Sequence, residues 1–285
     1  MPVTIGDVII VLEAAYPLAL AEPWDTGIGL TCGDPSETVT SVLLAVDVDH
    51  EVVRQAEELG VQLLVTHHPL LFRSVQSVSA DTAKGSLIHR LVRSGIAHYA
   101  AHTNADKAVG GVNDALAAAL GLVCPGPLVS DQVGTLPDGH VQAGRTGSGR
   151  IGHLESPIPL GQFADRVSAA LPATAAGVRV AGDPDRLISV VAVSGGAGGS
   201  FLDDAARAGA DVIVTSDLSH HVVAEHVADQ ARPAVVDVAH WAGEWPWLAR
   251  AASVINSSVT DASLAGSVTT TVSALCTDPW TMHRT

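Results

Sequence analysis

The chain has 285 residues, enough to bury a hydrophobic core in one large domain or in two lobes. Hydrophobic residues make up 47% of it and charged residues 16%, a balance typical of a packed chain rather than a disordered one. The formal net charge is −15. A surface this acidic repels phosphate groups, so we do not expect general nucleic-acid binding.

Three widely spaced cysteines, Cys32, Cys124 and Cys276, form no CxxC pair. They argue against a disulfide scaffold or a thiolate metal site and favour a reducing compartment. The apolar stretch from Val8 to Leu20 is interrupted by Glu13 and lacks a basic flank, so it predicts an amphipathic helix rather than a signal peptide. No apolar run reaches the length of a membrane span. We therefore expect a cytoplasmic protein without a membrane partner.

The first half of the chain alternates strands and helices. Asp49 is the expected N-cap of a helix that ends before Gly60, and Pro69 prevents the preceding strand from continuing. The expected elements are strands over Val39–Val48, Val61–Thr66 and Ile96–Ala101, and helices from Asp49 to Leu59, from Thr82 to Ser94 and from Val112 to Leu120.

Residues 122–150 are rich in Pro, Gly and Ser, and we interpret them as a connection. A short strand near Gly152 and a helix from Leu160 to Leu171 follow, and then the earlier pattern returns. The expected second set comprises strands over Leu187–Val193, Asp211–Thr215 and Ala234–Val238, and helices over Ser200–Ala208 and Ser219–Gln230.

The two halves can be laid over each other. One strand ends in Leu-Val-Thr66 and its counterpart in Ile-Val-Thr215, and the next strand of each half ends in Ala-His, at His102 and at His240. We predict an α/β protein of two pseudo-duplicated lobes with mostly parallel sheets, a single compact unit over 1–285. Lobe one covers about 1–125, the connection about 122–150, and lobe two about 151–285. In such sheets ligands bind, and catalytic residues lie, beyond the carboxyl ends of the strands.

Imidazoles and carboxylates stand at those strand ends: His67, His68, Asp106, His240 and Glu244. Taken singly, each has an ordinary structural role open to it, such as a capping aspartate or a buried histidine. Together they make a mixed nitrogen–oxygen set, which suits zinc, manganese, iron or nickel better than calcium. Five side chains exceed the needs of one tetrahedral zinc and fit two divalent ions between the lobes, with Glu244 as the bridging carboxylate.

Further polar residues border this predicted site. Asp217 and His220 follow a strand of the second half, and we assign them roles as ligand-orienting or proton-carrying groups, with helix capping as the alternative. His102 and Asn104 have either an orienting or a purely structural role. The Ser194–Gly199 run lies between a strand and a helix, but Phe201 stands where a dinucleotide-binding motif needs glycine, so we expect only a tight turn that leaves room for a ligand.

These motifs together resemble the Nif-three-like family, whose members carry the names GTP cyclohydrolase I type 2 homologue and dinuclear metal centre hexameric protein. The matching segments are Ala21–Gly27 with Gly29 and Leu30, Thr66–Leu70, Ala101–Asp106, Gly110–Asp114, Gly195–Gly198, Thr215–Asp217 with His220, and His240 with Glu244. The resemblance implies the same five metal ligands and a toroidal homohexamer with its metal sites facing an inner cavity. Some members carry an inserted domain between the halves, whereas the short connection here resembles the compact form.

Two departures from the family pattern affect the surroundings of the ligands. Ser216 stands in place of a glycine, and Trp241–Gly243 replaces an aromatic-Glu-Thr run. The leading hypothesis is a metal-dependent hydrolase of a nucleotide-like substrate, with GTP ring opening as the family name suggests. The alternatives are a non-catalytic metal-binding or delivery protein and a regulatory interaction protein whose metals are structural.

Overall fold

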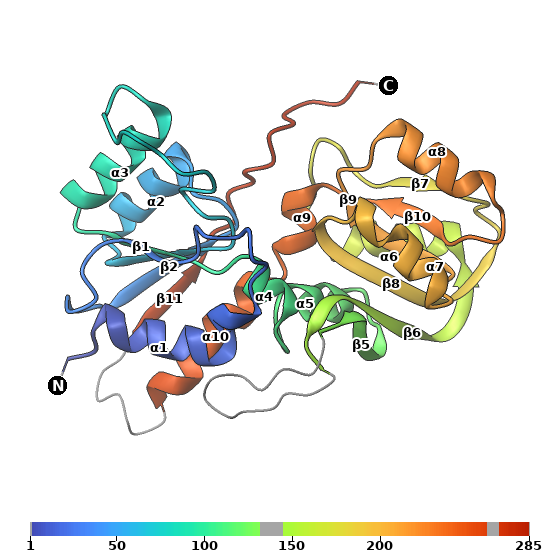
Figure 1. Ribbon diagram of the computed structural model, residues 1–285, viewed down its shortest axis with the longest axis horizontal. Helices are drawn as coiled ribbons and strands as arrows, with labels where there is room; N and C mark the ends of the chain where they lie inside the picture. Colours follow the sequence, from blue (N-terminus) through green and yellow to red (C-terminus); the bar gives the residue numbers. More distant parts are fainter. Residues whose placement is uncertain (1, 132–144, 261–267, 285) are drawn as a thin grey trace. The chain divides into compact units, whose positions relative to one another are not determined.

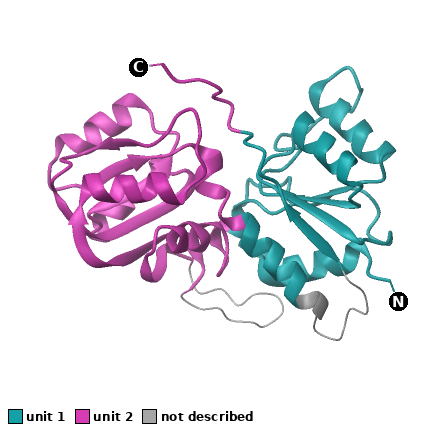
Figure 2. Ribbon diagram, turned by 180° about the vertical axis from the view of Figure 1, so that it is seen from behind, with its two compact units in different colours: residues 1–105, 248–277 teal, residues 106–247, 278–285 magenta. Residues whose placement is uncertain are grey.

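The computed structural model describes residues 2–131, 145–260 and 268–284. The chain divides into two compact units, each with its own sheet. Unit 1 comprises residues 1–105 and 248–277, and unit 2 comprises residues 106–247 and 278–285 (Figure 2). Within the described residues, no helix has both the length and the apolar character that crossing a membrane requires.

Unit 1 is built on a five-stranded sheet with the order β1-β4-β3-β2-β11 (Figure 1). All neighbours in it are parallel except the edge strand β1, which runs antiparallel to β4. Its strands are β1 (Gly29–Cys32), β2 (Ser41–Ala45), β3 (Leu63–Thr66), β4 (Ala97–Ala100) and β11 (Thr269–Val272). Its helices are α1 (Ile5–Ala15), the 3-10 turn η1 (Leu18–Leu20), α2 (His50–Leu59), α3 (Ala83–Arg93), α4 (Thr103–Lys107), which runs into unit 2, and most of α10 (Trp247–Thr260).

Local sequence signals set the ends of helix α2. The Asp49 carboxylate accepts hydrogen bonds from the Glu51 and Val52 backbone amides, and Gly60 ends the helix in the left-handed conformation at φ +63°. The buried face of α2, including Val52, packs into a core with residues of β2, β3 and α3. These helix bounds confirm the prediction.

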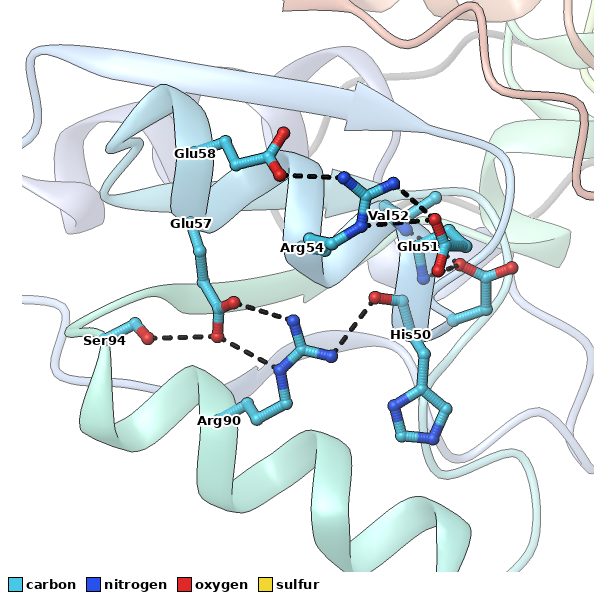
Figure 3. A network of polar contacts seen from close by, with 9 residues as sticks. His50, Glu51, Val52, Arg54, Glu57, Glu58, Arg90 and Ser94 are labelled. Carbon is cyan, nitrogen blue, oxygen red and sulfur yellow. Dashed lines mark hydrogen bonds and ion pairs between the residues drawn. The ribbon is translucent and has the colours of Figure 1, made fainter.

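An ion-pair network ties α2 to α3 on the solvent side of this core (Figure 3). The Arg90 guanidinium donates to both carboxylate oxygens of Glu57, at 3.1 and 2.7 Å, and to the His50 carbonyl at 3.2 Å. Ser94 Oγ donates to Glu57 at 3.2 Å. Arg90 therefore holds the pKa of Glu57 below its ordinary value.

Unit 2 contains a six-stranded sheet with the order β5-β6-β8-β9-β10-β7. Strands β8, β9 and β10 are parallel, and antiparallel strands extend the sheet at both sides. The strands are β5 (Val123–Ser130), β6 (Gly147–Pro159), β7 (Arg179–Ala181), β8 (Leu187–Ala197), β9 (Val212–Ser216) and β10 (Ala234–Asp237). The helices are α5 (Val112–Ala119), α6 (Leu160–Ala170), the 3-10 turn η2 (Gly199–Phe201), α7 (Leu202–Arg207), α8 (His220–Ala228) and α9 (His240–Glu244).

The two units repeat one topology. In unit 1 the strands β1, β2, β3 and β4 stand in the sheet order 1-4-3-2, and in unit 2 the strands β7, β8, β9 and β10 stand in the corresponding order 7-10-9-8. In each case the first strand is the antiparallel edge and the other three are parallel. The predicted duplicated α/β architecture is therefore confirmed.

The units do not follow the chain order that we expected for the lobes. The helix and strand that close the first repeat, α5 and β5, belong to unit 2, whereas those that close the second, nearly all of α10 and β11, belong to unit 1. Each unit is thus completed by a segment of the other repeat. Strand β11 extends the first sheet through its parallel pairing with β2.

Two local expectations are corrected by the structure. The stretch expected to be a connection begins with a strand, β5, which pairs with β6, while residues 132–144 of that stretch lie outside the described residues. The glycine-rich run is not a turn between strand and helix: β8 continues through it to Ala197. The register with β9 shifts between Val193 and Ala197, so this part of the strand is bulged.

Candidate metal centre

Three imidazoles gather at the carboxyl ends of two parallel strands in unit 1. His67 and His68 follow β3, and His102 follows β4, its neighbour in the sheet. The ring centroids of His67 and His68 lie 4.9 Å apart, and His102 lies 5.2 Å from His67 and 5.6 Å from His68. One ring nitrogen from each of the three lies within 4.8 Å of the others. This spacing suits a metal-binding group.

Oxygen acceptors fix the orientation of these rings through Nδ1. The Nδ1 of His67 lies 2.9 Å from the Ala101 carbonyl oxygen, and that of His68 lies 2.7 Å from an Asp47 carboxylate oxygen. The Nδ1 of His102 lies 2.9 Å from Asp25 Oδ2. A carbonyl or carboxylate oxygen can only accept, so each Nδ1 carries the proton and the lone pair stands on Nε2. Metal-ligating histidines are usually held in this way.

Asp25 and Asp47 are themselves held in place. Burial would raise the pKa of Asp25, but hydrogen bonds from His102 and Thr103 outweigh it and hold that pKa below its ordinary value. Thr103 donates to Asp25 Oδ2 from its hydroxyl at 2.6 Å and from its amide at 3.1 Å. The second oxygen of Asp47 accepts from the Thr277 hydroxyl. Both carboxylates are thus positioned to fix an imidazole.

Unit 2 carries a second imidazole–carboxylate group. His240 and Glu244 stand one turn apart on the short helix α9, with His240 Nε2 3.0 Å from Glu244 Oε1. Asp217, in the loop after β9, accepts from His240 Nδ1 at 2.6 Å. Asp217 adopts a left-handed backbone at φ +60°, unusual for a residue other than glycine. His240 therefore has the same Nδ1 arrangement as the three histidines of unit 1.

Gly196 in the bulge of β8 leaves room for this pair. A Cβ atom at Gly196 would lie 2.5 Å from Glu244 Oε1 and 3.0 Å from His240 Nε2, and the residue has φ +69°. Only glycine combines that backbone conformation with so close an approach. A methyl group at position 196 would fill the space beside the two donor atoms. One nitrogen and one oxygen donor make a set that fits a transition metal ion.

The remaining predicted residues have the following places. Asp106 lies on α4, one turn beyond His102, and its backbone carbonyl accepts from Asn113 at 3.0 Å. Asn104 is buried and structural: it accepts from the His102 amide at 2.9 Å and donates to the Tyr16 carbonyl at 2.7 Å. His220 is the exposed first residue of α8.

The structure thus brings His67 and His68 together in one unit and His240 and Glu244 in the other. That the two groups and Asp106 share one site remains a prediction.

Among the other histidines, His98 has a clear structural role. Its ring is fully buried and bonds the hydroxyls of Thr31 and Thr66, and burial lowers its pKa to about 3. His226 is also buried, with Nε2 2.9 Å from the Pro233 carbonyl oxygen. His140 lies outside the described residues.

Asp25 and Asp47 were not identified from the sequence as parts of the site, and Gly196 was noted only within a run expected to be a tight turn that leaves room for a ligand. Asp25 lies 77 positions before His102 in the chain, so only the fold brings the two together. Asp47 gave one usable signal, because it lies just beyond the carboxyl end of β2, the strand beside the one that leads to His68. A similar signal marked Gly196, which lies in a run of glycines at a strand end.

Comparison with known proteins places the whole chain in one family. The family model Duf34/NIF3 (NGG1p interacting factor 3) matches residues 3–279. A Streptomyces coelicolor protein named GTP cyclohydrolase 1 type 2 homolog is 44% identical over 279 residues, covering 98% of this chain and 94% of that protein. A Mycobacterium tuberculosis protein of the same name is 37% identical over an aligned span of 383 residues, covering 100% of this chain and 99% of that protein.

Solved structures agree with this assignment. The crystal structure of a Bacillus cereus protein related to NIF3 matches with a TM-score of 0.86 and 28% identity, covering 97% of this chain and 98% of that chain. A hypothetical protein of Staphylococcus aureus matches with a TM-score of 0.87 and 27% identity, covering 98% and 99% of the two chains. Sequence and fold together show that the chain belongs to the Duf34/NIF3 family.

Proposed function

We propose that the protein is a dinuclear metal-dependent hydrolase of a nucleotide-like substrate. In this proposal His67, His68, Asp106, His240 and Glu244 jointly hold two divalent ions, with zinc, manganese, iron and nickel as the candidates. The name GTP cyclohydrolase 1 type 2 homolog, carried by the relatives, suggests hydrolytic opening of a guanine ring as the reaction.

One observation carries the proposal: His67, His68, His102 and His240 each direct Nδ1 at an oxygen acceptor. The buried structural histidine His98 differs, because both of its ring nitrogens bond threonine hydroxyls, which can donate as well as accept and leave no ring nitrogen for a metal. The Nδ1 arrangement of the other four fixes the tautomer and strengthens the basicity of Nε2 when a histidine serves as a metal ligand. The same Nδ1 arrangement occurs at the strand ends of both units, which supports the proposal that each unit contributes half of one metal centre.

A pair of divalent ions would supply Lewis-acid chemistry and acidify water at neutral pH. The chain's own residues have supporting roles. Asp25, Asp47 and Asp217 hold the imidazoles, and Gly196 keeps the space beside Glu244 open. His220, exposed at the start of α8, is the candidate proton carrier.

The test combines metal analysis with turnover. Protein loaded with each candidate metal is assayed against GTP, in parallel with His68→Ala and a control, His89→Ala, which removes an exposed histidine of α3. We expect turnover by the wild type and the control and its loss in His68→Ala. Equal rates for the wild type and His68→Ala would refute the proposal. Metal binding without turnover of GTP or other phosphorylated compounds would favour a metal-delivery role.

We also propose a homohexamer, as the family resemblance implies. One chain has a mass of 29.1 kDa. Analytical ultracentrifugation is expected to give about six times this mass, and a monomer or dimer would contradict the proposal.

A further inference from the structure

We propose that a pocket in unit 2 binds a planar heterocycle through a ring edge on which a hydrogen-bond donor stands beside an acceptor. The pocket has a volume of about 390 Å³, within the range of small-molecule sites. Its lining residues come from β7, β10, the loop before α8 and the first half of α8; Figure 1 labels these elements. The inference rests on the proposed function, because it names the part of the substrate that this unit would hold.

A cross-strand ion pair forms the polar part of the pocket. Arg179 on β7 is the register partner of Asp237 on β10, and its guanidinium donates to Asp237 Oδ2. The Asp237 side chain is 10% exposed. Its Oδ1 is buried and forms no hydrogen bond within the described part of the chain, while the Leu218 backbone amide acts on the same carboxylate group. A buried oxygen of this kind is rare, and a ligand N–H is the kind of group that would satisfy it.

Arg179 supplies the complementary half. Its side chain is 69% exposed, and a guanidinium has five N–H donors, of which the pair with Asp237 uses only some. An acceptor on Asp237 and a donor on Arg179 therefore stand side by side. A lactam edge, in which a ring N–H adjoins a carbonyl, matches them, as do the corresponding edges of guanine and uracil.

Most of the remaining lining is apolar, which suits the faces of a flat ring. The apolar residues are Val180, Ala181, Leu218, Val223, Ala224 and Val235. Ser219 and His220, at the start of α8, complete the lining. Burial raises the pKa of Asp237 above its ordinary value, although Arg179 and the Leu218 backbone amide lower it, and the nearby charge of Asp217 adds a smaller raising effect.

The pocket is next to the unit 2 half of the candidate metal centre. Its residues Leu218 to His220 directly follow Asp217, which accepts from His240, and Asp237 precedes His240 by three residues. The polar end of the pocket, at Asp237 and at Leu218 to His220, lies at the carboxyl ends of β10 and β9, where ligands of parallel sheets bind. A ring held there would place the rest of the substrate near His240 and Glu244.

The test is calorimetric titration of the metal-loaded protein with guanosine, uridine, 1-methylguanosine and 3-methyluridine. The methylated nucleosides lack the ring N–H that Asp237 would accept. We expect one or both parent nucleosides to bind about tenfold more tightly than their methylated forms, because methylation leaves the buried Asp237 oxygen without a donor. Equal affinity of parent and methylated forms, or no binding of either parent, would overturn the proposal.

A pair of variants locates the binding. Val223→Trp fills the pocket, whereas Val222→Trp places the same ring at a neighbouring position of α8 that is 41% exposed and outside the lining. We expect at least a tenfold loss of affinity in the first and none in the second, and equal affinities in the two folded variants would contradict the pocket. GTP turnover by Val223→Trp at the wild-type rate would refute the pocket and leave the hydrolase proposal standing. If the wild type bound guanosine but did not turn over GTP, and Val223→Trp abolished that binding, the pocket would stand and the hydrolase proposal would fail.

Discussion

The substitution Gly196→Ala probes the candidate centre without removing any donor atom. The added Cβ would lie 2.5 Å from Glu244 Oε1 and 3.0 Å from His240 Nε2. Non-bonded atoms pack best at about 3.5 Å, so these two groups must move by roughly 0.5–1 Å. Metal–ligand distances tolerate changes of only about 0.2 Å. We therefore expect the affinity for the metal to fall at least tenfold.

The same substitution has a backbone cost that must be separated from this effect. A residue with a side chain at φ +69° loses about 1–2 kcal/mol of stability. Gly209→Ala is a matched control: it has φ +76° in the same unit, and its Cβ would meet nothing within 4 Å. Both variants should lose a similar amount of folding free energy, and only Gly196→Ala should lose metal.

The assay measures thermal unfolding together with the dissociation constant for zinc, determined by competition with a chromophoric chelator. Comparable destabilisation of the two variants with loss of zinc affinity in Gly196→Ala alone would agree with the geometry. If Gly196→Ala bound zinc with the affinity of Gly209→Ala, the bulge of β8 would not be what keeps space for an ion.

Three further results are expected. Asp217→Asn should weaken zinc binding about 10–100-fold at an unchanged melting temperature, since the carboxylate orients His240 and strengthens it as a ligand; an unchanged dissociation constant would speak against that role. Arg90→Gln should cost about 0.5–1 kcal/mol in urea unfolding at pH 7. Because Arg90 lowers the folded pKa of Glu57, this difference should vanish as the pH falls through that pKa, whereas a difference that persists in acid would exclude the ion pair as its cause. The folded pKa of His98, about 3, lies below its ordinary 6.5, so the unfolded chain binds this proton first as the pH falls. The free energy of unfolding should therefore decrease as the pH is lowered from 6.5 to 3, by up to about 1.4 kcal/mol per pH unit. His98→Asn should reduce this pH dependence in urea unfolding.

The regular parts of the fold could be predicted because their signals are local. Asp49 and Gly60 bound a helix through hydrogen bonds within a few residues, and His67-His68-Pro69 marks a strand end by the proline that follows. The duplication was visible because the same signals recur at the same spacing. The histidines at the predicted strand ends were therefore enough to indicate where the candidate site lies.

The elements that escaped prediction depend on distant partners. Strands β1 and β7 are only 4 and 3 residues long and exist through their pairing with β4 and β10. Pro125 and Pro127 concealed β5, but it is an edge strand, where missing amide donors are tolerated. The exchange of α10 and β11 into unit 1 leaves no mark in the local pattern.

The residues that support the candidate centre could not be predicted either, because they also depend on partners distant in the sequence. Asp25 and Thr103 are separated by 78 positions, and their hydrogen bond follows from the packing of the chain. Gly196 looked like a turn glycine because a bulge within a strand and a turn after a strand have the same glycine-rich signature.

In the proposed centre, imidazoles and carboxylates of both units hold one pair of ions. Anomalous diffraction from zinc-loaded crystals, measured at the zinc absorption edge, locates bound zinc directly. We expect two peaks per chain, about 3.5–4 Å apart, in contact with His67 and His68 and also with His240 and Glu244. A map without peaks at these residues, or with zinc bound by the histidines of unit 1 alone, would contradict it.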